Sequence, residues 1–137
     1  MSLLLENISK SYREPDGGRL PVLEIERFEM SRGEQMALVG ASGGGNQTMY
    51  AGAIDERLKC VVPVCSVGTY QAYLSAACCM CEVTPGALSY TEEAGVLSLV
   101  APRGLMLVNA TRDSFQFSVG EAKKSLAATR RVFRLYG

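Results

Sequence analysis

Two segments near the start of the chain show alternation of apolar and polar residues. Leu3 to Ile8 alternates loosely and predicts a strand, and Val22 to Phe28 alternates apolar and acidic residues, which predicts a half-exposed strand. Ser11 to Pro21 lies between them and contains Pro-Asp-Gly-Gly, so it predicts a turn or hairpin loop. We therefore expect antiparallel strands at the N-terminus.

Later in the chain the pattern changes to short runs that are apolar throughout: Met36–Val39, Cys60–Cys65 and Leu105–Val108. Such runs are typical of strands buried on both faces of a sheet. Each is followed by a segment of helical composition, and these helices are expected over residues 46–54, 69–79 and 119–131, the last with Val119, Ala122, Leu126 and Ala127 as its apolar positions. Because strands and helices alternate, we predict an α/β fold with a mainly parallel sheet and flanking helices.

Composition excludes several functional classes. The chain has 137 residues, with 14 Lys plus Arg and 14 Asp plus Glu, so its formal charge is zero. That balance argues against binding nucleic acid or anionic membranes through bulk electrostatics. No apolar run approaches the roughly 20 residues of a membrane span. The sequence contains no histidine, which excludes a self-contained Ser-His-Asp triad and any histidine-ligated metal.

The five cysteines lie at positions 60, 65, 78, 79 and 81. Cys78 and Cys81 form a C-x-x-C pair. A zinc site needs four ligands, however, and this chain has no histidine to supply one. We expect buried structural thiols, no metal and no cofactor. The first residues lack the basic start of a signal peptide, so a reducing, cytoplasmic location is expected.

The glycine-rich segment Gly40-Ala41-Ser42-Gly43-Gly44 is the most specific motif in the sequence. It matches G-x-S-x-G, the nucleophile elbow, in which a strained strand-to-helix turn exposes a serine and the next amide donates to an oxyanion. The same loop begins like a phosphate-binding loop, but Asn46 and Gln47 replace the lysine and the hydroxyl residue of that motif. A tight glycine turn without chemistry is the third interpretation.

Residues 1–42 resemble the start of an ABC transporter ATP-binding subunit, through Leu3 to Tyr12 and Ser31 to Ser42. The resemblance implies that Tyr12 stacks on adenine and that the strand ending at Val39 leads into the Walker A loop. The family's signature sequence, Walker B acid and switch histidine are missing. A nucleotide site built on this resemblance would comprise Tyr12, Gly40, Gly45 and Thr48.

Residues 43–137 resemble α/β-hydrolases of the acetyl xylan esterase type. The similarity lies in three stretches, 43–50, 55–66 and 105–113. It implies that Ser42 is the nucleophile, that the Gly43 amide stabilises the oxyanion, and that Asp113 is the triad acid after a late strand. The family's catalytic histidine would follow beyond Gly137.

Together the two resemblances describe a fusion whose halves, 1–42 and 43–137, share the elbow at 40–45. The expected function is that of a serine hydrolase acting on small-molecule carboxylic or acetyl esters, with little or no turnover because the base is absent. The alternatives are a nucleotide-binding module with a degenerate Walker A loop and a fusion without activity. We also expect marginal stability and self-association of the chain through exposed apolar surface.

Overall fold

The computed structural model describes residues 3–76 and 84–137. They fall into two compact units, Met1–Glu34 and Gln35–Gly137. The border between the units precedes the strand that leads to Ser42, so the family boundary expected at residue 42 lies inside the second unit. Which family each part derives from remains a prediction.

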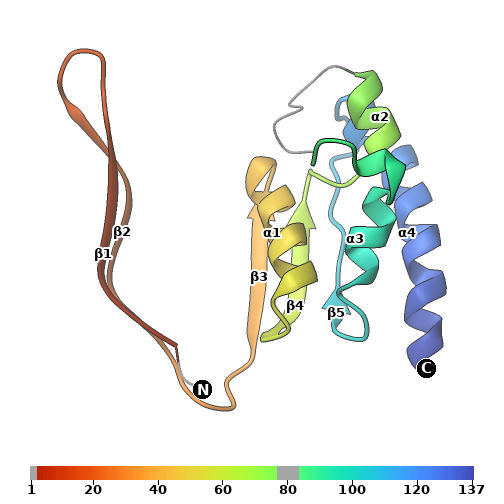
Figure 1. Cartoon of the computed structure of the whole chain (residues 1–137), viewed down its shortest axis with the longest axis horizontal. Coiled ribbons are helices and arrows are strands. Elements are labelled where there is room, and N and C mark those ends of the chain that lie inside the picture. Colours follow the sequence, from red (N-terminus) through yellow and green to blue (C-terminus); the bar gives the residue numbers. More distant parts are fainter. Residues whose placement is uncertain (1–2, 77–83) are drawn as a thin grey trace. The chain divides into compact units, whose positions relative to one another are not determined.

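The first unit is a two-stranded antiparallel ribbon of β1 (Leu3–Arg13) and β2 (Arg19–Met30), as Figure 1 shows. The antiparallel pairing confirms the prediction, but the connecting loop is shorter than Ser11–Pro21. A hydrogen bond from the Glu14 amide to the Gly18 carbonyl (2.9 Å) and the positive φ of Gly17 (88°) close the turn within a few residues. Strand pairing therefore continues to Arg13 and Arg19.

The second unit contains a three-stranded parallel sheet of β3 (Met36–Ala41), β4 (Leu58–Val64) and β5 (Gly104–Leu105), in that spatial order. The predicted third strand is mostly irregular: after Leu105 the chain makes only an isolated parallel bridge, between Val64 and Val108. The unit thus has the mixed α/β content that the sequence predicts, with parallel pairing in its sheet.

The described residues of this unit, 35–76 and 84–137, contain four α-helices. They are α1 (Gly43–Ile54), α2 (Tyr70–Ser75), α3 (Glu93–Ser98) and α4 (Val119–Phe133). Helix α1 and helix α4 confirm the predictions, whereas α3 was not predicted, and α2 ends before residues 77–79, which lie outside the described residues. Among the helices described here, none has the length and apolar character needed to cross a membrane.

The core of the second unit lies on one face of the sheet only. Val61 and Val100 are fully buried there together with Leu58, and Leu38 packs against them. Along β3, half-buried and exposed residues alternate, and Val39 is 60% exposed. The prediction that Met36–Val39 is buried on both faces is therefore wrong, because the core packs only against the face that carries Met36 and Leu38, whereas Ala37 and Val39 on the opposite face are exposed.

Helix α4 also differs from its prediction. Its buried positions are largely polar, and they are Glu121, Ala122, Ser125 and Thr129. Of the apolar positions expected to face the core, Val119 is 37% exposed and Ala127 is exposed. The reason is that the buried hydroxyls bond to backbone carbonyls of other segments, from Ser125 Oγ to Gly68 and from Thr129 Oγ1 to Ala94.

Candidate functional site

Ser42 lies at the junction of β3 and α1 in a strained backbone conformation, with φ 54° and ψ −126°. A positive φ is uncommon for a residue with a side chain and occurs where the surrounding structure enforces it. Here the Ser42 amide donates to the Val64 carbonyl (2.9 Å), and the Ser42 carbonyl accepts from the amides of Gly45 and Asn46 (2.8 and 3.1 Å). The strained strand-to-helix turn predicted for Ser42 is thus observed, and its side chain is exposed.

Two glycines around Ser42 are required by close packing. A Cβ on Gly40 would lie 2.3 Å from the Gly44 carbonyl oxygen and 2.5 Å from Thr48 Oγ1. A Cβ on Gly45 would lie 2.2 Å from Ser66 Oγ, whereas one on Gly44 would meet nothing within 4 Å. These contacts allow α1 to approach β3 and β4 closely, which is what an elbow requires.

The same packing accounts for the residues of the nucleotide alternative. Thr48 is buried and its hydroxyl packs against Gly40, so it is covered by the turn and not exposed to a ligand. Tyr12 belongs to the other compact unit, where it is 59% exposed and the Lys10 ammonium lies 5.3 Å from its ring centre. Gly40, Gly45 and Thr48 therefore have a structural explanation without a nucleotide.

The amides of Gly43 and Gly44 begin helix α1. The first amides of a helix have no acceptor within it and carry the positive end of the helix dipole. Gly43 thus occupies the position from which an amide would donate to an oxyanion beside Ser42.

Asp113 lies in the loop that follows the carboxyl ends of the parallel strands, and its side chain is exposed. Its carboxylate accepts a hydrogen bond from the amide of Ser114 (2.8 Å), a local turn interaction. Within the described residues, no hydrogen bond joins Asp113 to Ser42. The structure thus leaves the two predicted triad members without a direct contact.

The cysteines do not form a site in the described part of the chain. Cys60 and Cys65 are free and half-buried, and Cys65 has a positive φ of 49° directly after β4. Cys78, Cys79 and Cys81, and hence the C-x-x-C pair, lie outside the described residues. No cluster of three metal-ligating side chains occurs in the parts searched, which are residues 3–76 and 84–137.

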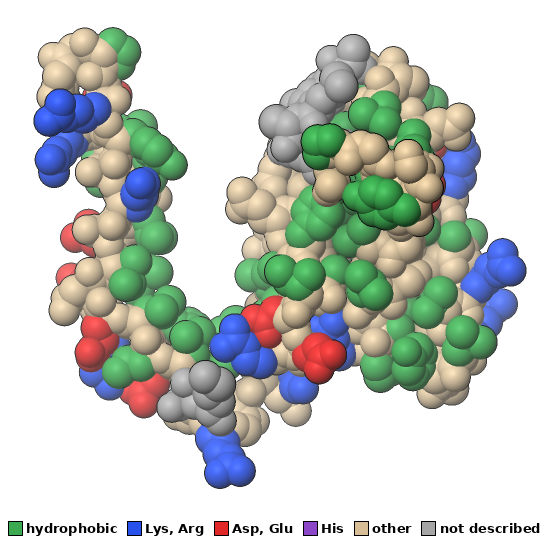
Figure 2. All heavy atoms as spheres, viewed as in Figure 1, with side chains coloured by type: hydrophobic (Ala, Val, Ile, Leu, Met, Phe, Trp, Pro, Cys, Tyr) green, Lys and Arg blue, Asp and Glu red, His purple; other side chains and the backbone are tan. Residues whose placement is uncertain are grey.

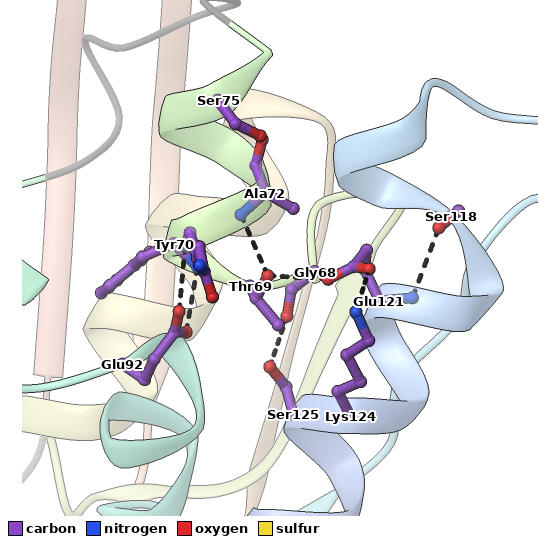
Figure 3. A network of polar contacts seen from close by, with 11 residues as sticks. Gly68, Thr69, Tyr70, Ala72, Ser75, Glu92, Ser118, Glu121, Lys124 and Ser125 are labelled. Carbon is purple, nitrogen blue, oxygen red and sulfur yellow. Dashed lines mark hydrogen bonds and ion pairs between the residues drawn. The ribbon is translucent and has the colours of Figure 1, made fainter.

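A second group of polar residues, which the sequence analysis did not single out, connects helices α2, α3 and α4 (Figure 3). The Glu92 carboxylate accepts hydrogen bonds from the backbone amides of Tyr70, Gln71 and Glu93 (3.0, 2.9 and 2.7 Å). It therefore caps α2 and α3 at once, and negative charge is favourable at both helix N-termini.

Glu121 makes the corresponding connection between α2 and α4. Thr69 Oγ1 donates to its Oε2 (2.8 Å), and the Lys124 ammonium pairs with its Oε1. Both interactions lower the pKa of Glu121, and the hydrogen bond from Lys124 has the larger effect. The Glu121 amide donates to Ser118 Oγ (3.3 Å), so Ser118 and Glu121 have the S-x-x-E spacing of a capping box, which is visible in the sequence.

Beside this network lies a surface hollow with a volume of about 520 Å³. The residues that line it include Ala72, Phe115 and Lys124. The polar groups at its edge, Glu92 and Glu121, already have partners within the chain. The hollow is therefore explained by helix packing and capping, and Ser42 does not line it.

Glu93, at the start of α3, is completely buried. Its Oε2 accepts a hydrogen bond from the Gly68 amide (3.2 Å), whereas Oε1 has no partner. Burial raises the pKa of Glu93 to about 8; the Gly68 amide opposes this shift and the nearby Glu92 carboxylate adds to it. At neutral pH the side chain is therefore mainly a neutral acid in the interior.

No protein-family model, curated protein or solved structure matches this chain. Function must therefore be inferred from the geometry of its own residues.

Proposed function

We propose that the unit Gln35–Gly137 is a serine-esterase-type scaffold in which Ser42 is the acyl-accepting nucleophile and no general base is present. The observation that carries this proposal is the backbone of Ser42, with φ 54° and ψ −126° between a parallel strand and a helix. A bare glycine turn would place glycine, the residue that adopts positive φ at least cost, at this position. Here the strain is placed on an exposed serine instead.

The surroundings support the same chemistry. In acyl transfer, the serine oxygen attacks the ester carbonyl, and the carbonyl oxygen becomes negatively charged. The Gly43 amide, at the start of α1, is suited to stabilise that charge. Ser42 is exposed on the surface and does not line the hollow beside α2 and α4, so small esters would reach it directly from solvent.

The proton of the serine hydroxyl limits the rate. The sequence has no histidine, and the Asp113 carboxylate is engaged with the amide of Ser114. Within the described residues no side chain is hydrogen-bonded to the Ser42 hydroxyl, so its proton would pass to water, and a positioned base typically contributes about 10²- to 10⁴-fold to such reactions. We therefore expect very slow turnover of esters by the chain alone.

A fluorophosphonate probe tests this proposal directly. It forms a bond between phosphorus and the serine oxygen, fluoride leaves, and the hydroxyl proton goes to a base. We expect slow labelling of Ser42, located by peptide mass spectrometry, and about tenfold or faster labelling when imidazole is added as an external base. Ser42→Ala should abolish the imidazole-dependent label.

The matched control is Ser114→Ala, which removes another exposed serine of the same unit and should leave labelling unchanged. The proposal fails if the probe labels several exposed serines at equal rates. It also fails if Ser42 stays unlabelled in the presence of imidazole while the protein is folded.

A further inference from the structure

Four consecutive residues at the start of helix α2, from Gly68 to Gln71, each donate a hydrogen bond to a glutamate of another segment. The Gly68 amide donates to Glu93, the Thr69 hydroxyl to Glu121, and the amides of Tyr70 and Gln71 to Glu92. We call these four residues and three glutamates the glutamate clamp, and much of it is drawn in Figure 3. Because α2 has only six residues, it depends on such tertiary contacts for its stability.

Glu93 differs from the other two glutamates of the clamp because it is completely buried. Most acidic residues that the structure describes are exposed, and Figure 2 shows in red those on the face that it draws. Glu92 is half-buried, and Glu121 pairs with the Lys124 ammonium. Within the described residues, the Gly68 amide is the only hydrogen-bond donor to Glu93, and Oε1 of Glu93 has no partner. A negative charge on Glu93 would therefore be buried without a counterion, which is costly.

The side chains around Glu93 supply no neutralising charge in the part of the chain that the structure describes. The titratable groups that interact with it electrostatically are Glu92, which is also acidic, and the Tyr70 phenol of α2. Further polar side chains from α1 and α4 surround the same segment, and they are Tyr50, Glu121, Lys124, Ser125 and Thr129. The cation among them, Lys124, pairs with Glu121 and is largely exposed. The clamp thus accommodates Glu93 as a neutral acid and opposes its ionisation.

We propose that the glutamate clamp is a latch that opens when Glu93 loses its proton, which releases residues 68–75 from α3 and α4. An ionised Glu93 can be hydrated only if a covering segment moves away, and α2 is anchored less firmly than α3. The buried tyrosines of α2 pack with Ala87 and Phe117, which belong to 3₁₀ helices of three residues each. Helix α3, in contrast, is held by Leu97 in a core cluster with residues of α1 and α4.

The acidity of Glu93 sets the pH range over which the latch responds. Burial raises the pKa of this carboxyl from 4.5 to about 8 in the closed form, whereas the open form exposes it to water. Between these values the equilibrium constant for opening rises about tenfold per pH unit, because only the open form has released the proton. From pH 6 to pH 8 the increase is roughly 50-fold, and above pH 8 it levels off. The proposal is independent of the chemistry at Ser42.

Hydrogen exchange of the full chain, read by mass spectrometry of its peptides between pH 6 and pH 9, tests the latch. After correction for the intrinsic base catalysis of exchange, we expect the amides of residues 68–75 to exchange roughly 50-fold faster at pH 8 than at pH 6. The amides of β4 exchange when the whole unit unfolds, so their protection factors should stay at least about tenfold higher at every pH.

Glu93→Gln should reduce the response of residues 68–75 to less than about threefold, because glutamine has no proton to lose. Glu56→Gln is the matched control and should retain the wild-type response, since its carboxylate is exposed. Circular dichroism establishes that both variants are folded.

Three results would each overturn the proposal. The first is one common protection factor for residues 68–75 and β4 at pH 8, which would show that Glu93 is released only by global unfolding. The second is exchange of residues 68–75 in the wild type without the expected pH response. The third is a wild-type response in folded Glu93→Gln. The first two comparisons need only the wild type, so they decide the matter even if Glu93→Gln does not fold.

Discussion

Replacing Glu93 by glutamine is expected to remove most of the dependence of stability on pH between pH 5 and 9. In the wild type, the folded protein binds the Glu93 proton more tightly than the unfolded chain does, because the carboxyl is buried and Oε1 has no partner. Its pKa rises from 4.5 in the unfolded chain to about 8 in the folded protein. A neutral glutamine cannot titrate.

The sign follows from proton linkage. Between pH 4.5 and about pH 8 the unfolded chain releases the Glu93 proton while the folded protein retains it, so stability falls as pH rises. The loss is about 1.4 kcal/mol per pH unit, and it reaches on the order of 5 kcal/mol above pH 8. The lowered pKa of Glu121 has the opposite effect: it makes stability rise with pH, and it does so only below about pH 4.5.

Urea unfolding at pH 5, 7 and 9 measures this effect. We expect the wild type to lose several kcal/mol from pH 5 to pH 9, and Glu93→Gln to lose much less. At pH 5 the variant should be slightly less stable than the wild type, because the buried glutamine amide has two N–H donors where the protonated carboxyl has one O–H donor. Glu56→Gln is the matched control: its exposed carboxylate remains in water in both states, so the wild-type slope should persist. Equal slopes in wild type and Glu93→Gln would contradict the burial of this carboxyl.

Replacing Gly68 by alanine is expected to be severely destabilising. A Cβ at Gly68 would lie 1.7 Å from the backbone carbonyl oxygen of Gln116, a distance that no side-chain movement can relieve. The Asn109 side chain fixes both segments, since its Nδ2 donates to the carbonyls of Val67 (2.9 Å) and Phe117 (3.0 Å). Separating them would break these bonds and the contact from Glu93 to the Gly68 amide.

The expected loss is about 4 kcal/mol or more, the range reached when a core contact must be rebuilt. It would appear as a lower urea midpoint or as loss of the folded protein from the soluble fraction. Gly120→Ala provides the control, since its Cβ would lie 3.7 Å from Ser118 Oγ, an ordinary contact, at the start of helix α4. Because alanine favours helix over glycine, this variant should match or exceed the wild type by up to about 1 kcal/mol. A Gly68→Ala protein of wild-type stability would show that the two segments separate freely.

The local pattern of the sequence predicted the elements that have a strong local signal. Alternation predicted the β-ribbon, the apolar runs predicted β3 and β4, and the glycine motif predicted the strained turn at Ser42. These features depend on neighbouring residues, so a short window of sequence contains their cause. Helix α3 was missed because its six residues contain a glycine and too few turns to establish a period.

What the sequence by itself determined is therefore the antiparallel ribbon, the strands β3 and β4 with the helices α1 and α4, the absence of a histidine, and the strained strand-to-helix turn at Ser42. Only the tertiary structure decided which face of each apolar strand is covered, since Val61 and Val62 are equally apolar in sequence and differ in burial. It also decided that Glu93 is buried, that Glu92 caps the start of α2, and that Glu121 accepts a hydrogen bond from the Thr69 hydroxyl. The physical reason is that burial and capping depend on partners 22 to 52 residues away, whose positions no local pattern specifies.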